Sequence, residues 1–133
     1  KYRGLAEQVP AFSLSDGTLS YLAFVGIFRL LERFPDTTSL LAFDEPDLHL
    51  HPSLLMRVLS TFEEAAKGMP VLVTTHSDVL VSALSSQPDS VLVAEHMAAS
   101  THLFRLEIEK LRFWLDRYRL GEIWRMGQLG GNP

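Results

Sequence analysis

Two short apolar runs, each followed by a helical pattern, constrain the fold of this chain more than any other feature. The first run, residues 39–43, ends at Asp44 and Glu45, and the second, residues 71–75, ends at His76. Continuously apolar strands are typical of parallel sheets that are covered on both faces. The alternation of strand and helix therefore predicts an α/β fold with right-handed crossovers and a mostly parallel sheet flanked by helices.

The spacing of apolar residues predicts the helices around these strands. A long helix over residues 16–34 is apolar on most of its circumference, which suits a helix covered by another part of the protein or by a partner. A second helix begins at Pro52 and is expected to end at Gly68. The remaining expected elements are a short helix at 79–84, strands at 91–94 and 102–106 joined near Ser100 and Thr101, a helix at 109–118, and a loop or poorly ordered tail from Gly121 onward.

Composition limits the class of protein. The 133 residues, 47% of them hydrophobic, suit a single globular domain over residues 1–133. A net charge of −4 gives no electrostatic reason to expect strong nucleic-acid binding, so DNA contacts would come from other regions. The absence of cysteine fits a reducing compartment, for which the cytoplasm is the default. We expect no membrane contact, because every apolar run is shorter than the roughly 20 residues of a membrane span. We also expect no signal peptide, because Lys1-Tyr2-Arg3 leads into Gly4 and Glu7 rather than into an apolar stretch.

Polar residues gather where the two predicted strands end. Ligands of open α/β sheets bind beyond the carboxyl ends of the strands, and this edge carries Asp44, Glu45 and His76. A hydrophobic strand that ends in two acids is the Walker B pattern: the first acid holds a metal ion, usually through water, and the second orients or deprotonates an attacking water. A simpler explanation is that both acids cap the next helix.

Ser15 and Gly17 stand at the start of the long helix, where free N–H groups and the positive end of the helix dipole attract an anion. Simple capping by Ser15 or Asp16 explains these residues as well. The order of the motifs favours the functional interpretation. Leu-Ser-x-Gly opens a helix, a strand ends in Asp-Glu-Pro, a helix follows, and the next strand ends in Thr-His-Ser. Over residues 12–84, this order resembles that of ATP-binding-cassette ATPases.

Within that superfamily, Ser-Asp-Gly-Thr-Leu and Phe-Asp-Glu-Pro-Asp-Leu-His-Leu-His-Pro resemble the RecF-like and overcoming-lysogenization-defect group of AAA-type ATPases. The tail Gly-Glu-Ile-Trp-Arg-Met-Gly resembles one often found in these proteins. The resemblance implies a partial P-loop NTPase fold with its N-terminal P-loop lobe missing. Its parts would be a signature helix at 16–34, Walker B at 40–45 and a C-terminal extension at 107–133.

The resemblance also implies ligands and roles. Asp44 would help to bind Mg²⁺, Glu45 would position the hydrolytic water, and His76 would be the switch histidine that senses the γ-phosphate of ATP. Ser15 and Gly17 would contact the γ-phosphate of ATP held by the P-loop of a partner subunit, so the full-length protein is expected to be a homodimer. DNA repair, phage defence and toxin–antitoxin systems all agree with the resemblance.

The sequence contains no G-x-x-x-x-G-K-[ST] segment, and no glycine-rich loop precedes Lys1, Lys67 or Lys110. The simplest explanation is that the chain is the C-terminal half of a longer ATPase. The amides and the lysine of a P-loop supply most of the contacts to the phosphates. We therefore expect this chain alone to bind nucleotide weakly and to hydrolyse little ATP.

Other interpretations remain open. A degenerate ATPase fold kept only for dimerisation would explain the same motifs. A metal-dependent hydrolase is a further alternative, because closely spaced His and carboxylate side chains ligate zinc or manganese, although solvated pairs are commoner; its ligands would be Glu45, Asp47, His49 and His51. The helix at 109–118 and its flank also mix aromatic and basic residues, as nucleic-acid surfaces do, but we expect aromatics on the sheet and arginines in solvent; these residues are Arg112, Phe113, Trp114, Arg117, Tyr118 and Arg119.

Overall fold

A computed structural model describes residues 9–48 and 50–131 of the chain. These residues belong to two compact units, Lys1–Val73 and Thr74–Pro133, and each unit has its own helices and strands. Within the described ranges, no helix is both long enough and apolar enough to cross a membrane.

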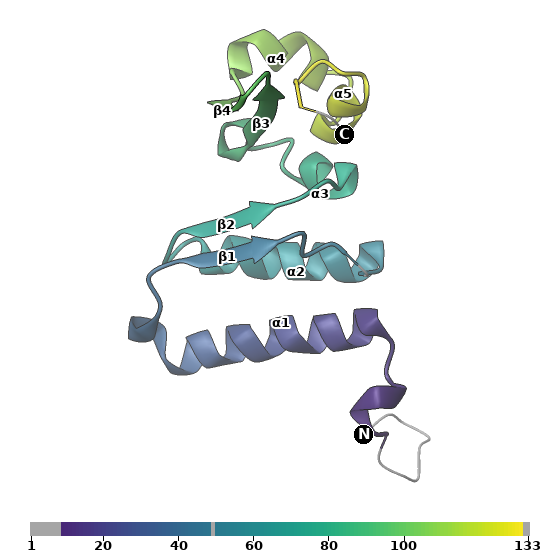
Figure 1. Cartoon of the computed structure of the whole chain (residues 1–133). Helices are drawn as coiled ribbons and strands as arrows, with labels where there is room; N and C mark the ends of the chain where they lie inside the picture. Colours follow the sequence, from purple (N-terminus) through teal and green to yellow (C-terminus); the bar gives the residue numbers. More distant parts are fainter. Residues whose placement is uncertain (1–8, 49, 132–133) are drawn as a thin grey trace. The chain divides into compact units, whose positions relative to one another are not determined.

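The first unit is built on a strand–helix–strand arrangement. It contains α1 (Asp16–Arg33), β1 (Leu41–Asp44), α2 (Pro52–Ala65) and β2 (Val71–Thr74), whose last residue opens the second unit. β1 and β2 form a two-stranded sheet and run in the same direction (Figure 1). Where the two strands begin, the N–H of Leu41 in β1 donates to the carbonyl of Pro70, just before β2, at 3.0 Å. The parallel pair predicted around α2 is therefore confirmed, and α2 ends at Ala65 rather than at Gly68.

Phenylalanine rings join α1, β1 and α2 within the first unit. Phe43 of β1 stacks on Phe62 of α2 with 4.7 Å between ring centroids. Phe24 of α1 lies 5.5 Å from Phe43 and 5.9 Å from Phe62, and Phe28 extends the same cluster. Tilted and edge-on pairs at these distances stabilise a core beyond the area that they bury. The cluster attaches one side of α1 to the sheet and to α2.

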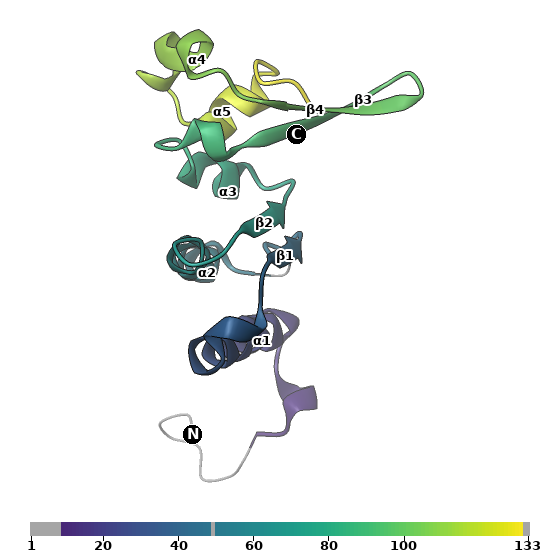
Figure 2. The same ribbon diagram turned by 90° about the vertical axis from the view of Figure 1, so that its left-hand side faces the viewer.

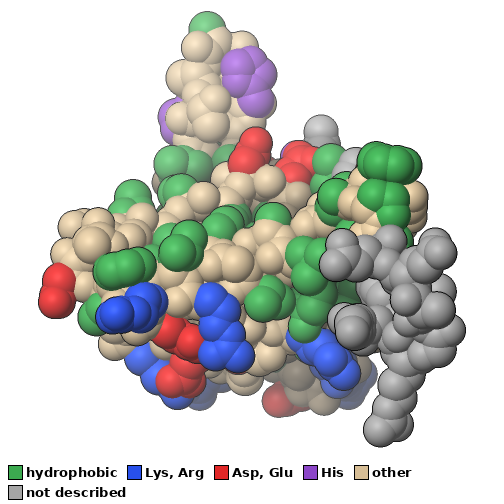
Figure 3. All heavy atoms as spheres, turned by 90° about the horizontal axis from the view of Figure 1, so that it is seen from below, with side chains coloured by type: hydrophobic (Ala, Val, Ile, Leu, Met, Phe, Trp, Pro, Cys, Tyr) green, Lys and Arg blue, Asp and Glu red, His purple; other side chains and the backbone are tan. Residues whose placement is uncertain are grey.

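The opposite side of α1 is apolar and exposed. No residue of α1 is fully buried, and Leu22 and Leu30 are 50% and 62% exposed. Figure 3 shows hydrophobic side chains distributed over the face of the molecule that is viewed from below Figure 1. The exposed large hydrophobic side chains of α1 are Leu19, Leu22, Val25, Ile27 and Leu30. The predicted helix is confirmed, and its doubly apolar pattern corresponds to one packed side and one exposed side.

The prediction that both sheet faces are covered is wrong for the described residues. Leu41 is buried and Phe43 contacts α2, so α2 covers the face that carries these two side chains. The next residues along the strands point to the other face, where Ala42 is exposed and Leu72 is 51% exposed. The continuous apolar run thus predicted a cover that the described helices of the first unit do not provide on that face.

The second unit contains α3 (Asp78–Ala83), β3 (Leu92–Met97), β4 (Ser100–Arg105), α4 (Ile108–Leu115) and α5 (Leu120–Arg125). β3 and β4 form the predicted antiparallel hairpin, drawn as a long two-stranded ribbon in Figure 2. Its register pairs Leu92 with Arg105 and Met97 with Ser100. The turn is centred on Ala98 and Ala99 rather than on Ser100 and Thr101, and Ala98 takes a φ of 55°.

The prediction of a loop-like tail from Gly121 onward is wrong. Leu120 and Ile123 of α5 are 0% exposed and lie in the core of the second unit with Val81, Val93 and Leu111. The carboxylate of Glu122 accepts from the N–H of Arg119 at 2.7 Å, which satisfies a backbone donor at the start of α5. The later glycines adopt left-handed turns, with φ of 71° at Gly127, and so they end the helix without making the whole tail a loop.

Truncating Ile123 is expected to destabilise the second unit strongly. An Ile→Ala change at a fully buried site removes apolar contacts and leaves a cavity, which typically costs about 2–5 kcal/mol. The free energy of unfolding of Ile123→Ala, measured in urea, should fall by this amount. Met126→Ala is the matched control, because Met126 is 46% exposed and its loss should change stability by about 0.5 kcal/mol or less. Equal effects of the two changes would contradict the observed burial.

Candidate functional site

The end of β1 has an unusual backbone. Asp44 is the last residue of the strand and is exposed, while Glu45 is half-buried and Pro46 is buried. Glu45 has a φ of 44°, in the left-handed region that residues other than glycine rarely adopt. This conformation costs roughly 1–2 kcal/mol and persists only where the surrounding structure imposes it, often at functional sites.

A tight turn follows this reversal. The N–H of Leu48 donates to the carbonyl of Glu45 at 3.0 Å, and the N–H of Leu50 donates to that of Asp47 at 3.0 Å. Because Glu45 leaves the extended conformation, its side chain does not continue the alternation of the strand. The two adjacent carboxylates can therefore serve different atoms of one ligand. Carboxylate oxygens are also the ligands that Mg²⁺ prefers, so this pair has the chemistry of a magnesium site.

The capping explanation for the two acids is wrong. α2 begins at Pro52 and has no acidic residue in its first turn. Its N-cap is His51, whose Nδ1 accepts from the N–H of Ser53 at 3.3 Å and lies 2.9 Å from the hydroxyl of Ser53. Asp44 and Glu45 thus lie before the turn that precedes the helix, and the helix does not explain their presence.

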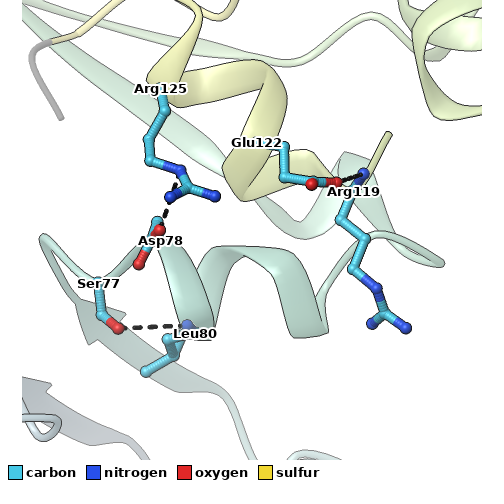
Figure 4. Close-up of polar contacts among 6 residues, drawn as sticks. All are labelled: Ser77, Asp78, Leu80, Arg119, Glu122 and Arg125. Atoms are coloured by element: carbon cyan, nitrogen blue, oxygen red, sulfur yellow. Dashed lines mark hydrogen bonds and ion pairs between the residues drawn. The ribbon is translucent and has the colours of Figure 1, made fainter. Parts of the chain in front are cut away.

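His76 lies in the second unit, between the end of β2 and the start of α3. The hydroxyl of Thr75 accepts from the N–H of Ser77 at 2.9 Å. Ser77 is the N-cap of α3 and accepts from the N–H of Leu80 at 3.3 Å (Figure 4). The His76 side chain is exposed. Hydrogen bonds on both sides of this residue fix the backbone that carries the imidazole.

Ser15 is the N-cap of α1, as the capping explanation predicted. Its hydroxyl accepts from the N–H of Thr18 at 3.3 Å and lies 2.9 Å from the hydroxyl of Thr18. Asp16 begins the helix and does not cap it. Gly17 occupies the first turn and is half-buried. Ser15 and Gly17 therefore lie at a helix N-terminus, and contact with a partner's nucleotide stays a prediction.

The metal-hydrolase alternative has no support from the described residues. No group of three or more His, Asp or Glu side chains among them is placed to hold a metal ion. His51 caps α2, and His49 lies outside the described residues.

The aromatic residues of α4 and of the turn after it divide between core and solvent. Trp114 packs against the core of the second unit, as expected. Phe113 is 64% exposed and Tyr118 is 39% exposed, so the expectation that these aromatics pack inward is wrong for both. The guanidinium of Arg117 lies 5.1 Å from the Phe113 ring centroid, which covers part of the exposed ring. This cation–π contact gives Phe113 a partner in the turn that follows α4.

Comparison with protein families matches residues 2–82 to a family described as "AAA domain, putative AbiEii toxin, Type IV TA system". The matched range covers more than half of the chain. The chain belongs to this AAA-domain family. Residues 2–82 include Ser15, Gly17, Asp44, Glu45 and His76, so all five candidate site residues lie within the family's own domain.

A curated ATPase is similar to part of this chain, and a solved ATPase structure shares its fold. A retron Ec83 probable ATPase from Escherichia coli is 38% identical over 52 residues, 39% of this chain and 10% of the relative, so the match spans about a tenth of that protein. An SMC ATPase of known structure superposes on this chain with a TM-score of 0.62 at 20% identity. That structure is described in terms of the ATP-driven dimerization and DNA-stimulated activation of SMC ATPases. This second match covers 84% of our chain and 66% of that one. The predicted ATPase family and the α/β, P-loop NTPase class of fold are confirmed.

Helix α5 makes contacts with α3 that the sequence did not predict. Arg125 of α5 forms an ion pair with Asp78 of α3 at 3.1 Å (Figure 4), and Gly121 of α5 packs against α3. The glycines of the tail obscured this helix, although the spacing of Leu120 and Ile123 and an acid three residues after Arg119 were available signals.

Proposed function

We propose that this chain provides the signature, Walker B and switch-histidine elements of an ATP-hydrolysing dimer of the ABC type. The observation that carries the proposal is the end of β1, where Asp44 and the left-handed Glu45 follow a strand paired in parallel with β2. No helix cap explains these acids. A P-loop would come from a part of the assembly outside this sequence, and we call the chain combined with that part the P-loop assembly.

In this proposal the two acids have separate tasks. Asp44 would hold Mg²⁺, which supplies charge neutralisation for the β- and γ-phosphates when bound. Glu45 would orient a water molecule and accept its proton as the water oxygen bonds to the γ-phosphorus. The bond from the γ-phosphorus to the bridging oxygen would break in the same step, with ADP as the leaving group. The half-buried position of Glu45 and the turn that fixes its carbonyl restrict the directions that its carboxylate can take.

Three further residues would bind the nucleotide. His76 would donate a hydrogen bond to the γ-phosphate from a backbone that the hydroxyls of Thr75 and Ser77 stabilise. Ser15 and Gly17 would present the N-terminus of α1 to ATP held by the partner subunit, since backbone N–H groups there attract anions. The SMC ATPase that this chain resembles in fold undergoes ATP-driven dimerization, which supports a dimeric arrangement here.

A second candidate is an interaction module that retains the fold without hydrolysing ATP. The exposed apolar side of α1 favours it, because contiguous apolar surface of this kind marks a docking face. This candidate predicts that the P-loop assembly forms but does not turn over ATP.

Replacing His76 tests the ATPase proposal against this candidate. In the P-loop assembly, His76→Ala should lower the rate of phosphate release by about 10²-fold, the typical effect of losing one preorganised donor to a developing charge. His96→Ala is the matched control, since His96 is an exposed histidine of β3. It should leave the rate unchanged. No ATP turnover by the wild-type assembly, or equal rates for the two variants, would refute the role given to His76.

A further inference from the structure

The helix that follows His76 is attached to the tail of the chain. Asp78, in the first turn of α3, forms an ion pair with Arg125 of α5 at 3.1 Å, and Figure 4 shows the two side chains pointing toward each other. In the turn that follows α3, the hydroxyl of Ser85 accepts from the N–H of Leu120 at 2.9 Å. α5 therefore contacts the first turn of α3, whose N-cap is the residue after His76, and also the turn that follows α3.

Gly121 brings the two helices together. A Cβ atom at this position would lie less than 3.0 Å from the carbonyl oxygen of Asp78 and from the hydroxyl of Ser82, which no side chain tolerates without a shift. Leu120 and Ile123, on either side of Gly121, are 0% exposed. The close approach leaves α3 little freedom to slide along α5, since packed interiors transmit small displacements.

We propose that Gly121 and Arg125 are positioning residues for His76. The inference rests on the proposed ATPase function and adds to it a role for the C-terminal segment. His76 is joined to Asp78 through Ser77 alone, and the hydrogen bonds of Thr75 and Ser77 make this connection stiff. Holding Asp78 thus holds the backbone of His76, and with it the donor to the γ-phosphate.

Because the ion pair is exposed, its loss should affect the rate and the free energy of folding differently. The side chains of Arg125 and Asp78 are 61% and 33% exposed, and ion pairs with this much solvent contribute little to the free energy of folding. A purely structural α5 would therefore tolerate loss of the pair. A positioning α5 would not, because displacing a group by about 1 Å lowers a rate by up to about 10²-fold.

The test is Arg125→Ala in the P-loop assembly. We expect kcat for ATP hydrolysis to fall about 10-fold while KM for ATP stays within about twofold, since only the geometry of His76 changes. Arg125→Lys should restore most of the rate. Asp78→Asn, which removes the same ion pair from the other helix and keeps the shape of the side chain, should reproduce the loss. Lys110→Ala is the matched control, because it breaks the ion pair of Lys110 with Glu107 at 2.8 Å in the same unit and should change neither constant.

A second measurement needs no ATP turnover. In this chain, the NMR chemical shifts of the His76 imidazole should move in Arg125→Ala and Asp78→Asn and stay unchanged in Lys110→Ala. Unchanged His76 shifts in both ion-pair variants would overturn the inference whatever the activity of the assembly. Wild-type kcat in both, with Glu45→Gln inactive, would overturn the inference and leave the proposed ATPase function standing. Wild-type kcat in Glu45→Gln would instead overturn the proposed function.

Discussion

Glu45→Gln is expected to lower ATP turnover by the P-loop assembly about 10²–10⁴-fold, the usual cost of removing a general base. The amide of glutamine matches the carboxylate in shape and keeps the backbone of the turn, but it does not accept a proton from water. ATP binding should persist, because Glu45 is not assigned any contact with the phosphates. Single-turnover measurement of phosphate release, with binding measured separately, checks both statements.

Two observations would separate this result from a loss of folding. Glu63→Gln is the matched control, because Glu63 is an exposed acid on α2 and its change should leave turnover at the wild-type rate. The free energy of unfolding of Glu45→Gln should also stay close to that of the wild type. Turnover by Glu45→Gln at the wild-type rate would remove the general base from the proposed mechanism and favour the interaction module.

The elements around the candidate site could be predicted because their patterns are local. The helix at 16–34 and the strand that ends at Asp44 follow from periodicity and from the residues that stop it. The left-handed backbone of Glu45 could not be predicted, since glutamate carries no preference for this region and only the surrounding structure imposes it. The sequence thus predicted which acids stand at the strand end, but not the backbone conformation of the second one.

Predictions that depended on partners of the elements were less successful. The continuous apolar run at 39–43 indicated two covered faces, and the described helices of the first unit cover only the face that carries Leu41 and Phe43. The exposed side of α1 has the same character. Periodicity reports that a surface is apolar, but it does not say whether this chain or another part covers it. Both open surfaces agree with a fold that continues in a P-loop part, which stays a proposal.

The tail shows the opposite error. Its four glycines, at 121, 127, 130 and 131, suggested a loop, yet Gly121 lies inside α5. This glycine is required by a close contact with α3 rather than by a turn, and its backbone does not take a positive φ. Because sequence alone does not distinguish a glycine that ends a helix from one that lets two helices touch, the link between α5 and the His76 segment was missed.

Mixing two inactive variants should restore activity if the proposed sites are shared between subunits. Gly17→Asp places a carboxylate at the N-terminus of α1, where it would repel the γ-phosphate of the partner's ATP. Glu45→Gln damages the site of its own subunit. In a twofold dimer that contains one copy of each variant, both defects fall in one site and the other site is intact. Random mixing puts half of the dimers in this class, so turnover should rise from nearly zero to about a quarter of the wild-type value.

A second mixture, of Glu45→Gln with His76→Ala, tests whether the signature acts on the partner's nucleotide. Glu45 and His76 are proposed to serve the same subunit's nucleotide, so a dimer of Glu45→Gln with His76→Ala has one defect in each site and should stay inactive. Phosphate release at equal total protein, after the subunits have exchanged, measures both mixtures. Rescue by Gly17→Asp but not by His76→Ala would support a signature that acts on the partner's ATP. Rescue by neither, with mixed dimers demonstrated, would place Gly17 on its own subunit's nucleotide. Wild-type turnover by Gly17→Asp alone would place Gly17 away from any nucleotide, and the N-terminus of α1 would then keep only the capping role that Ser15 already performs.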